Sequence, residues 1–513
     1  MEKKWWTLLV VCAATFMLLL DVTIVIVALP EIQRGLHASF SDVQWVIDAY
    51  ALTLASLLLT AGTLADRYGR RLLFIIGLSI FTLGSLLCGF AQSPLMLTLS
   101  RSAQGVGGAI LFATSLALLA QSFRGKDRGV AFGVWGAITG VAVALGPILG
   151  GVITSGISWR GIFLVNIPFG IAAIIITVMK VDESRTPQAS RPDWAGFALL
   201  TVGLVTLVYG LIRASETTWG NGGVIVCLAA AVVLGLTFFL VERRSAHPMF
   251  DLSLFRIPTF SGGLAAAFAM NGSLFAMLLY IVLYLQNDLG YSALATGARL
   301  LVTSGGTLVA ATIAGRLSSH MPVRWLIGPG LALVGIGLFL MSGINASTSW
   351  THLIPGFIVA GVGAGMVNPP LASTAVGVVT PDRSGMASGV NTTFRQIGIA
   401  VGIAVYATIF SNELQKGLSH SLDHVKAVGN EAVTWNLHHV VTSVKEGQAS
   451  EVIKSTPAAF RPQLVHALQT SFTGALNDLF VVSGTLALVG AVLAMIFIRQ
   501  KDFVAQRQAG SSH

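Results

Sequence analysis

The most informative shortage in this chain is that of charge, because only 10% of its 513 residues are Asp, Glu, Lys or Arg. A soluble globular protein carries about 25% charged residues. Hydrophobic residues make up 54% of the chain, and the mean hydropathy is +0.78. Water cannot solvate such a chain over its whole surface. A soluble globular protein is therefore excluded, and lipid is the expected solvent.

Cysteine is also scarce. The three cysteines, Cys12, Cys88 and Cys227, all fall within apolar runs, and this odd, scattered set offers neither a disulfide framework nor the spacing of a metal site. His420 and His424 lie four residues apart, as metal ligands on a helix can. No third ligand accompanies them, so we predict a solvated helical face and no metal site.

Motifs of nucleotide-driven pumps and of hydrolases are missing as well. The chain contains neither a Walker phosphate-binding loop nor a nucleophile elbow. The net charge of +9 could indicate nucleic acid, but the Lys and Arg residues of membrane proteins gather in cytoplasmic loops. We therefore expect neither an enzyme nor a nucleic-acid-binding protein.

Apolar runs long enough to cross a bilayer, for which a helix needs about 20 residues, are abundant. The first run is too long for a signal peptide and is expected to remain as the first helix. We expect an all-α polytopic membrane protein with about fourteen transmembrane helices. The runs lie roughly at 5–29, 43–64, 72–91, 95–121, 129–154, 161–180, 194–213, 222–241, 259–286, 293–315, 323–343, 352–379, 385–411 and 473–498.

The connections between these runs differ in positive charge, which predicts the orientation. Most of the 31 Lys and Arg residues fall in alternate connections, those that are cytoplasmic if the N-terminus is inside. We therefore expect a multi-pass protein of the cell (inner or plasma) membrane with both termini in the cytoplasm. The one long polar stretch, residues 413–470, falls between the last two runs and is expected outside the cell.

Two distant loops of the chain are similar in sequence. Gly62–Arg71 ends the second run and Gly315–Arg324 ends the tenth, with Ser319 in place of Asp66. This repeat predicts two homologous six-helix halves, the arrangement of a transporter that rocks around a central site. The expected divisions are residues 1–185, two inserted helices within 186–256, and residues 257–513.

The first of these loops carries the most specific pattern in the chain. A turn this short between two helices needs glycine where backbones approach each other. Asp66 can cap the following helix or pair with a cation, and Arg128, at the mouth of the fifth run, is a candidate partner. The alternative is an ordinary basic loop. We interpret the pattern as a conformational gate formed by Gly62, Asp66, Arg67, Gly69, Arg70, Arg71 and Arg128.

This loop is similar to the signature loop of the major facilitator superfamily, and the chain as a whole resembles that superfamily's fourteen-spanning drug:proton antiporter family. The resemblance extends from Leu20 to about Phe480. Ile26 stands where the family has Asn, so a polar role at that position is lost. The stretches that carry the resemblance are Leu20–Pro30, Arg101–Gly105, Gly140–Gly151 and Trp159–Pro168.

The resemblance implies both a fold and an activity. The fold is the major facilitator fold, two six-helix bundles with two inserted helices. The activity is the export of lipophilic, cationic drugs such as quaternary ammonium compounds in exchange for protons. The implied partners are a lipophilic small molecule, protons and the lipid bilayer. No cofactor is expected, because the proton gradient supplies the energy, and we expect a monomer.

The fifth run contains a motif rich in glycine and proline. Gly136, Gly140 and Ala144 are four residues apart, so this face could admit a close neighbouring helix, and a proline permits a kink. Packing alone explains these residues. The resemblance adds that the motif is typical of antiporters, in which it shapes the hinge of opening. Its residues are Gly140, Gly146, Pro147, Gly150 and Gly151.

Charged residues inside apolar runs are costly in lipid and are functional by default. Asp21 lies about 12 Å and Arg101 about 10 Å from the outer ends of their helices at 1.5 Å per residue, so the two can pair. A purely structural ion pair is the alternative for Asp21, and an interfacial or structural role is the alternative for the other acids. We predict proton coupling by Asp21, Asp48, Arg101 and Asp478.

The second half lacks counterparts of these residues, since Phe357 aligns with Arg101 and Ala360 with Gln104. The chemistry of coupling is therefore expected in the first half. Aromatic and methionine side chains in the ninth run suit an adaptable drug cavity, although helix packing explains them equally well. The expected cavity is lined by Gln104, Asn271, Phe275, Met277, Tyr280, Tyr284 and Arg395.

These features predict a proton-coupled antiporter that works by alternating access. Burial disfavours the charged form of a carboxylate and a cationic drug favours it, so the proton and the drug would compete for one group. The alternative within transport is export of an endogenous metabolite such as a siderophore, an antibiotic or a lipid precursor. A second alternative is a membrane sensor or scaffold that does not transport.

Overall fold

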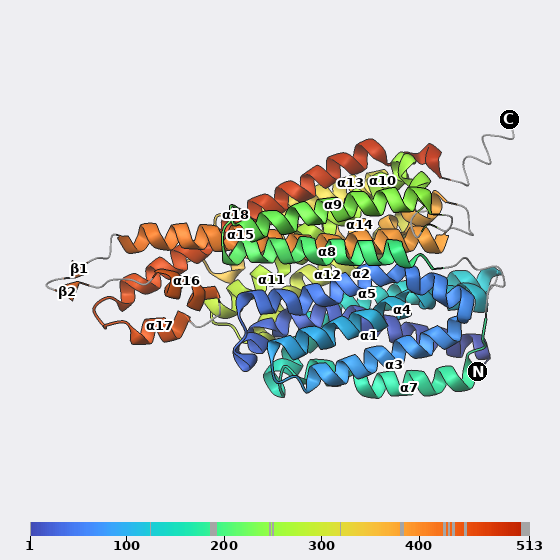
Figure 1. The fold of residues 1–513 in the computed structure, drawn as a ribbon, viewed down its shortest axis with the longest axis horizontal. Helices are drawn as coiled ribbons and strands as arrows, with labels where there is room; N and C mark the ends of the chain where they lie inside the picture. The colour runs from blue at the N-terminus through green and yellow to red at the C-terminus, as the bar shows by residue number, and fades with distance from the viewer. Residues whose placement is uncertain are drawn as a thin grey trace.

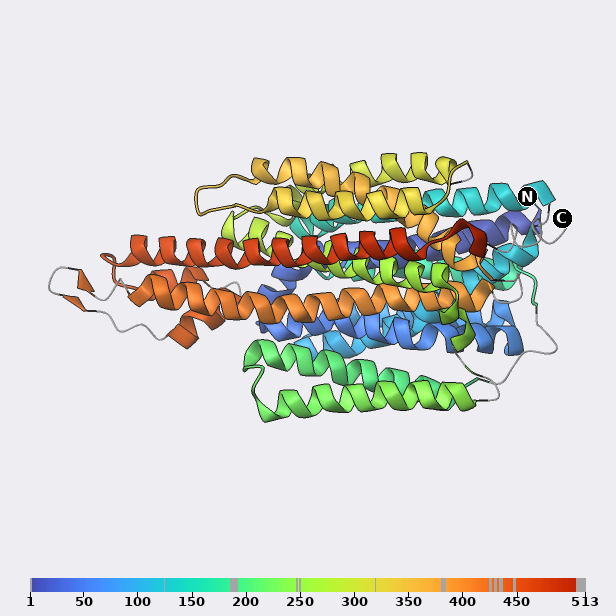
Figure 2. The same ribbon diagram turned by 90° about the horizontal axis from the view of Figure 1, so that it is seen from above.

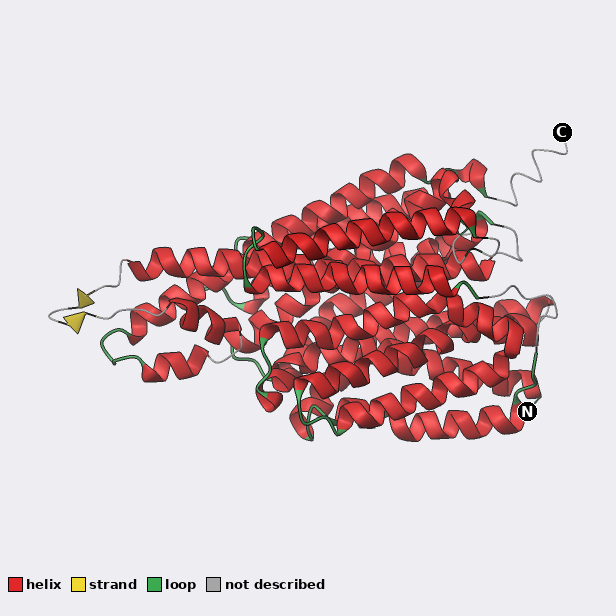
Figure 3. Cartoon of the chain, viewed as in Figure 1, coloured by secondary structure: helices red, strands yellow, loops and turns green. Residues whose placement is uncertain are grey.

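The computed structural model is almost entirely helical (Figures 1 and 3). Within the described part of the chain, 14 helices are long and apolar enough to cross a membrane. The prediction of an all-α polytopic protein with fourteen transmembrane helices is therefore confirmed. The structure describes all residues except 1, 124, 185–191, 246–247, 249–250, 319, 380–383, 424–426, 429–430, 433–436, 446–448 and 504–513.

The first half consists of helices whose starts follow from local capping. The Ser39 side chain accepts a hydrogen bond from the backbone of Asp42, and the Asp42 carboxylate accepts one from the backbone of Ser39, which forms a capping box. Pro94 begins a helix at a position that tolerates proline. The helices are α1 (Lys3–Leu36), α2 (Phe40–Tyr68), α3 (Arg70–Gly89), α4 (Pro94–Ser122), α5 (Gly125–Gly156), the short α6 (Gly161–Leu164) and α7 (Asn166–Lys180).

The two inserted helices, α8 (Trp194–Glu216) and α9 (Gly222–Arg244), lie side by side at the margin of the molecule (Figure 2). α8 packs on α2 and on α15 (Ser384–Asp423), whereas α9 packs mainly on α8. Only 11% of the most apolar stretch of α9 is buried. Lipid is the solvent that its exposed aliphatic side chains require.

The second half contains one irregular span. The span expected at 259–286 is interrupted by two π-helical turns, at Asn271–Phe275 and Tyr284–Asp288. Such turns are rare and frequently mark functional positions. The elements are η1 (Leu252–Arg256), α10 (Pro258–Met270), η2 (Asn271–Phe275), α11 (Ala276–Leu283), η3 (Tyr284–Asp288), α12 (Ala293–Leu317), α13 (Arg324–Met341), η4 (Trp350–Leu353), α14 (Ile354–Gly377), α15, α18 (Arg461–Phe497) and η6 (Gln500–Asp502).

The two halves pack in the same order. In the first half α4 packs on α2 and α3, and α3 packs on α7. In the second half α14 packs on α12 and α13, and α13 packs on α18. The halves meet where α2 lies against α15 and α5 lies against α12. We call this contact between the halves the seam.

Residues 413–470 extend from one end of the bundle, and the first residues of α1 lie at the other end (Figure 1). α15 and α18 continue past their neighbours into this segment. Leu418, Val444 and Leu468 are buried there, so the segment has an apolar interior as well as a polar surface. Its other elements are β1 (Ala427–Val428), antiparallel to β2 (Glu431–Ala432), α16 (Leu437–Lys445) and α17 (Ala449–Ser455).

Candidate functional site

A buried ion pair connects α1 and α4 inside the first half. Arg101 donates through Nη1 to the Asp21 carboxylate, and the two side chains are 2% and 0% exposed. Gln104 donates to Asp21 Oδ1 at 3.1 Å and accepts from Arg101 Nη1 at 2.8 Å. The structure thus brings together the two charges whose matched depth predicts a pair. Gln104 belongs to this network rather than to a drug cavity.

The network extends to α2 and α3 through residues that were not predicted. Arg101 Nε donates to the Val46 carbonyl at 3.1 Å, and the guanidinium lies 4.3 Å from the centre of the Tyr50 ring, within cation–π range. Ser85 accepts from Gln104 Nε2 at 2.7 Å. Positions 46 and 50 share one face of α2, a signal that could have indicated Tyr50. Four helices are therefore held by one buried charge pair.

Asp48 of α2 is a second buried carboxylate. It is 0% exposed, and neither of its oxygens has a hydrogen-bond partner in the described structure. It is not the interfacial, water-exposed residue that its place in the sequence allowed. Asp48 interacts electrostatically with Tyr280 of α11, which belongs to the other half. An ionised carboxylate without a partner is costly in such surroundings, so a proton or a cation must balance it.

Asp478 occupies a different environment from the other acids predicted for coupling. It is exposed on α18, where it interacts electrostatically with Glu413 and Lys416 of α15. Those two residues form an ion pair of their own at 2.6 Å. An exposed carboxylate does not supply the buried group that coupling inside the membrane needs. The structure therefore separates Asp478 from Asp21 and Asp48.

The loop between α2 and α3 is docked on the chain that follows α7. Gly69 has φ of +126°, a conformation that favours glycine. The Glu183 carboxylate accepts backbone N–H bonds from Arg71 and Leu72, each at 3.1 Å, and so satisfies the free N-terminus of α3. Arg71 also donates to the Val178 carbonyl at 2.5 Å. No local pattern predicts Glu183, because it lies 112 residues from Arg71.

Asp66 forms its ion pair within its own loop. Arg70 donates to Asp66 Oδ1 through Nε at 2.9 Å and through Nη2 at 2.8 Å. Arg67 is exposed, and Gly62 is half-buried on α2. The side chain of Arg128, the other candidate partner of Asp66, lies outside the described residues. A carboxylate held by an arginine four residues away is one component of the gate that the loop pattern predicts.

Gly146 and Gly150 of the fifth-span motif let α5 approach α1 closely. A Cβ at Gly150 would lie 2.9 Å from the Ile24 carbonyl oxygen. One at Gly146 would overlap the Thr23 side chain. The contact leaves no room for larger residues at these two positions.

The close approach does not involve the face that the four-residue spacing predicts. Among the described atoms, nothing lies within 4 Å of a Cβ placed at Gly136, and a Cβ at Gly140 would meet only the end of Leu308, at 3.4 Å. This correction has a tertiary cause, because the spacing shows that a face is smooth and not which helix lies opposite it.

The same motif brings α5 against the other half. A Cβ at Gly151 would lie 2.7 Å from the Ala293 carbonyl oxygen of α12. Pro147 lies inside α5, and its carbonyl faces Gly297 of α12 so closely that a Cβ there would overlap it. The motif therefore serves packing within the first half and closure of the seam at once.

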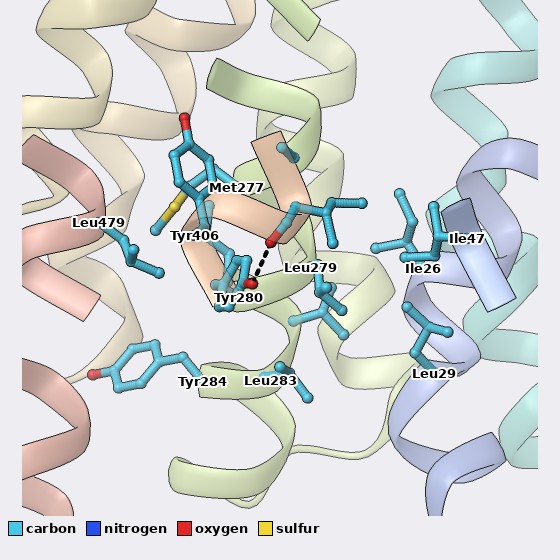
Figure 4. Close-up of a cluster of buried hydrophobic side chains, with 14 of the residues drawn as sticks. Ile26, Leu29, Ile47, Met277, Leu279, Tyr280, Leu283, Tyr284, Tyr406 and Leu479 are labelled. Carbon is cyan, nitrogen blue, oxygen red and sulfur yellow. Dashed lines mark hydrogen bonds between the residues drawn. The ribbon is translucent and has the colours of Figure 1, made fainter. Parts of the chain in front are cut away.

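Most of the aromatic and methionine residues predicted to line a cavity pack in the core in this conformation (Figure 4). Met277, Tyr280 and Tyr284 are each no more than 1% exposed, and the Tyr280 hydroxyl donates to the Ile403 carbonyl at 2.9 Å. Asn271 is 6% exposed and donates to a carbonyl of its own helix. In this conformation these residues therefore pack between helices, as the alternative interpretation predicts, and do not line a drug cavity.

Phe275 lines a small pocket between the halves. The pocket is bounded by α1, α5, η2, α11, α12 and α14, and Thr303, Ser304 and Thr307 add hydroxyl groups to a mainly apolar lining. Its volume is about 50 Å³, whereas a drug site needs about 300–1,000 Å³. The seam is therefore nearly closed at this point.

Arg395 of α15 is held by two amides. Its Nε donates to Asn391 Oδ1 at 3.2 Å, and its Nη1 donates to Asn368 Oδ1 of α14 at 3.1 Å. None of the ion pairs between described residues includes Arg395. Among the described residues, Arg395 is thus hydrogen-bonded without a balancing charge.

The described residues contain no group of three or more His, Cys, Asp and Glu side chains that could hold a metal ion. His420 lies near the end of α15. His424, the other member of the spaced pair, lies outside the described residues.

Two similar helical bundles that meet at a seam, with buried charges beside it, define a secondary membrane transporter. Residues 11–403 match the sequence model of the Major Facilitator Superfamily. The chain belongs to this superfamily, so it is a transporter and not an enzyme. The resemblance seen in the motifs is confirmed.

The relatives are efflux transporters. The chain is 36% identical over 418 residues to the multidrug resistance protein Stp of Mycobacterium tuberculosis, which covers 81% of this chain and 78% of the relative. It is 31% identical over 511 residues to the tetracenomycin C resistance and export protein of Streptomyces glaucescens, covering 98% and 92%. A solved bacterial homolog of the human lysosomal transporter Spinster, inward-facing and unoccupied, has a TM-score of 0.63 at 15% identity and covers 98% of both chains. That likeness shows the shared fold alone.

Proposed function

We propose that this protein exports lipophilic small molecules in exchange for protons, and that Asp48 carries the proton. The observation that carries the proposal is that Asp48 is fully buried and that neither of its oxygens has a hydrogen-bond partner among the residues that the structure describes. Burial of a polar group without a partner is costly, and much more so when the group is charged. A carboxylate that must take up and release a proton during a cycle is a reason for such a cost to persist.

The position of Asp48 relates its protonation to movement of the halves. α2 packs on α15 across the seam, and Asp48 interacts electrostatically with Tyr280 of the other half. When the halves separate, water can reach Asp48 and accept its proton. When they close again, the carboxylate must be neutralised by a proton or by a cation. This requirement would couple proton movement to alternating access.

The Asp21–Arg101–Gln104 network is the second candidate for proton exchange. Asp21 is the deepest acid of α1 and is one of the residues that the sequence predicts for proton coupling. It is already balanced by Arg101 and hydrogen-bonded to Gln104, so it can take up a proton without penalty only after Arg101 moves away. We therefore assign proton uptake to Asp48 and assign to this network the positioning of α1 against α2 and α4.

A cationic drug remains the substrate class that the resemblance implies. Asp48 could balance the charge of such a drug, which would make the drug and the proton compete for one carboxylate. The names of a multidrug resistance protein and of a tetracenomycin C resistance and export protein support efflux of lipophilic compounds of more than one kind. We further propose that the protein acts as a monomer and needs no cofactor.

We also propose that residues 413–470 lie outside the cell and that both termini are cytoplasmic. At the end of the bundle that carries this segment the halves are tied together. Gln286 Nε2 donates to the Val27 carbonyl at 2.8 Å, and the Leu294 N–H donates to Ser155 Oγ at 3.0 Å. These two bonds close that end of the seam in this conformation.

Cysteine labelling on intact cells tests this orientation. In a background in which the three native cysteines are replaced by Ser, Ala459→Cys places a thiol at an exposed position of the segment. Ser443 is only 5% exposed and is unsuitable. A membrane-impermeant maleimide should label Ala459→Cys on intact cells, and Lys501→Cys, exposed at the other end, only after permeabilisation. The reverse pattern would invert the topology.

Proton release on addition of drug to the reconstituted protein tests the coupling. With ethidium as the lipophilic cation, the wild-type protein should release protons and Asp48→Asn should lose nearly all of this release. Asp478→Asn alters an exposed carboxylate and is the matched control, so it should behave as the wild type. Undiminished release from Asp48→Asn, with loss in Asp21→Asn, would transfer the role to Asp21.

Export of an endogenous metabolite is the second candidate function. It is favoured by the relative named for both resistance to tetracenomycin C and its export. Deleting the gene in its native host and comparing the small molecules of cells and medium tests this candidate. An unchanged medium, together with drug susceptibility that rises on deletion, would favour drug efflux. A sensor or scaffold that does not transport is disfavoured by the efflux functions for which the relatives are named.

A further inference from the structure

The Arg395 cluster contains unused hydrogen-bond donors and an unbalanced positive charge. A guanidinium has five N–H donors, and the protein occupies two of them through the amide oxygens of Asn391 and Asn368. Three donors of Arg395 remain. None of the ion pairs between described residues includes Arg395, so its charge is left for something else to balance.

Asn391 supplies a second, independent observation. It is 4% exposed, and its Nδ2 has no hydrogen-bond partner in the described structure. The orientation of this amide is determined by Arg395, because turning it over would set two donors against each other. A buried donor without an acceptor is costly. It lies beside the unused donors of Arg395, so the same acceptor could satisfy both groups.

The cluster lies beside the pocket at the seam. Ala364 lines that pocket, and Asn368 follows it by four residues, about one turn further along the same face of α14. Asn368 and Arg395 are both half-buried, so neither is sealed into a core. α14 begins at the loop that follows α13, and this loop lies at the end of the bundle that carries residues 413–470 (Figure 2). The cluster therefore lies on the side of the pocket nearer the first residues of α1. A molecule that enters the seam from that side would pass it.

We propose that Arg395, Asn391 and Asn368 form a subsite for an acidic group, a carboxylate or a phenolate, of the exported molecule. This inference rests on the proposed export function and adds a substrate class to it. The free groups known at the site are donors, and its net charge is positive. A guanidinium fork matches a carboxylate in shape and charge, and such bonds are stronger than bonds between neutral groups.

A purely structural role does not account for the whole cluster. One hydrogen bond from Arg395, to Asn368, does link α14 to α15. That link leaves the buried Asn391 donor unused, and a neutral donor could make the same link without an arginine charge that no ion pair between described residues balances. Cationic compounds could still be balanced at Asp48 in the other half, so lipophilic molecules that carry both charges fit this arrangement as well.

Two dyes with a common xanthene skeleton and opposite charge test the assignment. We would titrate the purified full-length protein, in phosphatidylcholine nanodiscs at neutral pH and without a gradient, with anionic fluorescein and with cationic rhodamine 123. The wild type should bind fluorescein. Arg395→Gln removes the charge, and Asn368→Asp adds a balancing carboxylate. Each should weaken fluorescein binding by about tenfold or more and change rhodamine 123 binding by less than about twofold.

Arg299→Gln is the matched control. Arg299 is another half-buried arginine of the second half, but it stacks on Tyr291 at 3.5 Å and on Trp350 at 4.8 Å from the ring centres. This variant should bind both dyes as the wild type does. Because binding is measured without a proton gradient, a failure of the proton-coupling proposal at Asp48 would leave these expected affinities unchanged.

Three results would overturn the proposal. The first is a wild-type protein that fails to bind fluorescein. The second is equal weakening of both dyes, or of neither, in Arg395→Gln and Asn368→Asp. The third concerns an anionic lipid headgroup as the source of the acidic group. This result has two parts, both measured in nanodiscs that contain phosphatidylglycerol. The wild type would lose fluorescein binding there, whereas Arg395→Gln would keep it. The natural occupant of the site would then be a lipid headgroup.

Discussion

The two halves of the molecule hold an arginine inside an apolar run in different ways, one fully buried and the other half-buried. Arg101 in the first half bonds to a carboxylate, an amide and a backbone carbonyl, and it lies over an aromatic ring. Arg395 in the second half bonds to two amide oxygens. The first network is electrically complete, whereas the second is complete only when an anion arrives. Two bundles of similar fold can therefore differ in function. The first stabilises its arginine with a carboxylate of its own, and the second leaves its arginine to bind an anionic group.

The difference arises from substitution on equivalent helices. Phe357 and Ala360 of α14 align with Arg101 and Gln104 of α4, and they are 1% and 0% exposed. Apolar packing replaces the polar network at that place in the second half. The arginine of the second half is supplied by α15 instead, and no acid on α10, α11 or α14 pairs with it.

The largest expected effect is a difference in the free energy of unfolding between variants of Arg101 and Arg395. Arg101→Gln leaves the buried Asp21 without its counter-charge, which should cost about 3–5 kcal/mol of the free energy of unfolding. Arg395→Gln removes a charge that nothing balances, so its cost should be about 1 kcal/mol. Equilibrium unfolding in mixed micelles measures both. Equal losses would show that the two networks do not differ as described.

A double-mutant cycle sharpens the comparison within the first half. Asp21→Asn and Arg101→Gln, alone and combined, should show a coupling energy of about 0.5–3 kcal/mol, because the residues are in contact. The same cycle on transport rate should be non-additive. Purely additive losses in stability and in transport would mean that the two residues act independently.

Substitutions at two glycines of α12 test whether close packing across the seam keeps it closed. Gly297→Ala should cost about 1–3 kcal/mol by overpacking, because its Cβ would overlap the Pro147 carbonyl across the seam. Gly305→Ala is the matched control, since nothing lies within 4 Å of its Cβ. In Gly297→Ala a cysteine at Ser155 should label faster from outside. Equal labelling rates in the two variants would show that the contact between Gly297 and Pro147 does not keep the seam closed.

The smallest effect on stability is expected at the loop of the first half. Asp66 and Arg70 are 42% and 22% exposed, so Asp66→Asn should change the free energy of unfolding by no more than about 1 kcal/mol. If the loop is the conformational gate that its sequence pattern predicts, this variant should retain ethidium binding and slow ethidium export. Loss of binding while export kinetics stay normal would contradict the gate assignment.

Parts of the fold and of the site could be predicted because they follow from short-range rules. Spans follow from the length and polarity of each run, and each predicted run coincides with a span of the structure, although α1, α15 and α18 continue beyond the predicted bounds. The Asp21–Arg101 pair follows from depth along two helices at a fixed rise. Glu183 could not be found in this way, since it meets the loop of α2 and α3 from 112 residues away. The burial of Tyr280 and Tyr284 depends on the partners of an irregular span.

Asp48 and Asp478 differ in burial, and only the tertiary structure reveals that difference. Both are acids near the N-terminal end of an apolar run, and no local sequence pattern distinguishes them. Asp48 faces the neighbours of α2 and is 0% exposed, whereas Asp478 faces outward from α18. Composition alone determined that lipid is the solvent and that the chain crosses it as helices, because each helix satisfies its own backbone hydrogen bonds. Only the packing decided how each helix is turned about its axis, and that rotation decides which charges are buried, paired or left for a substrate.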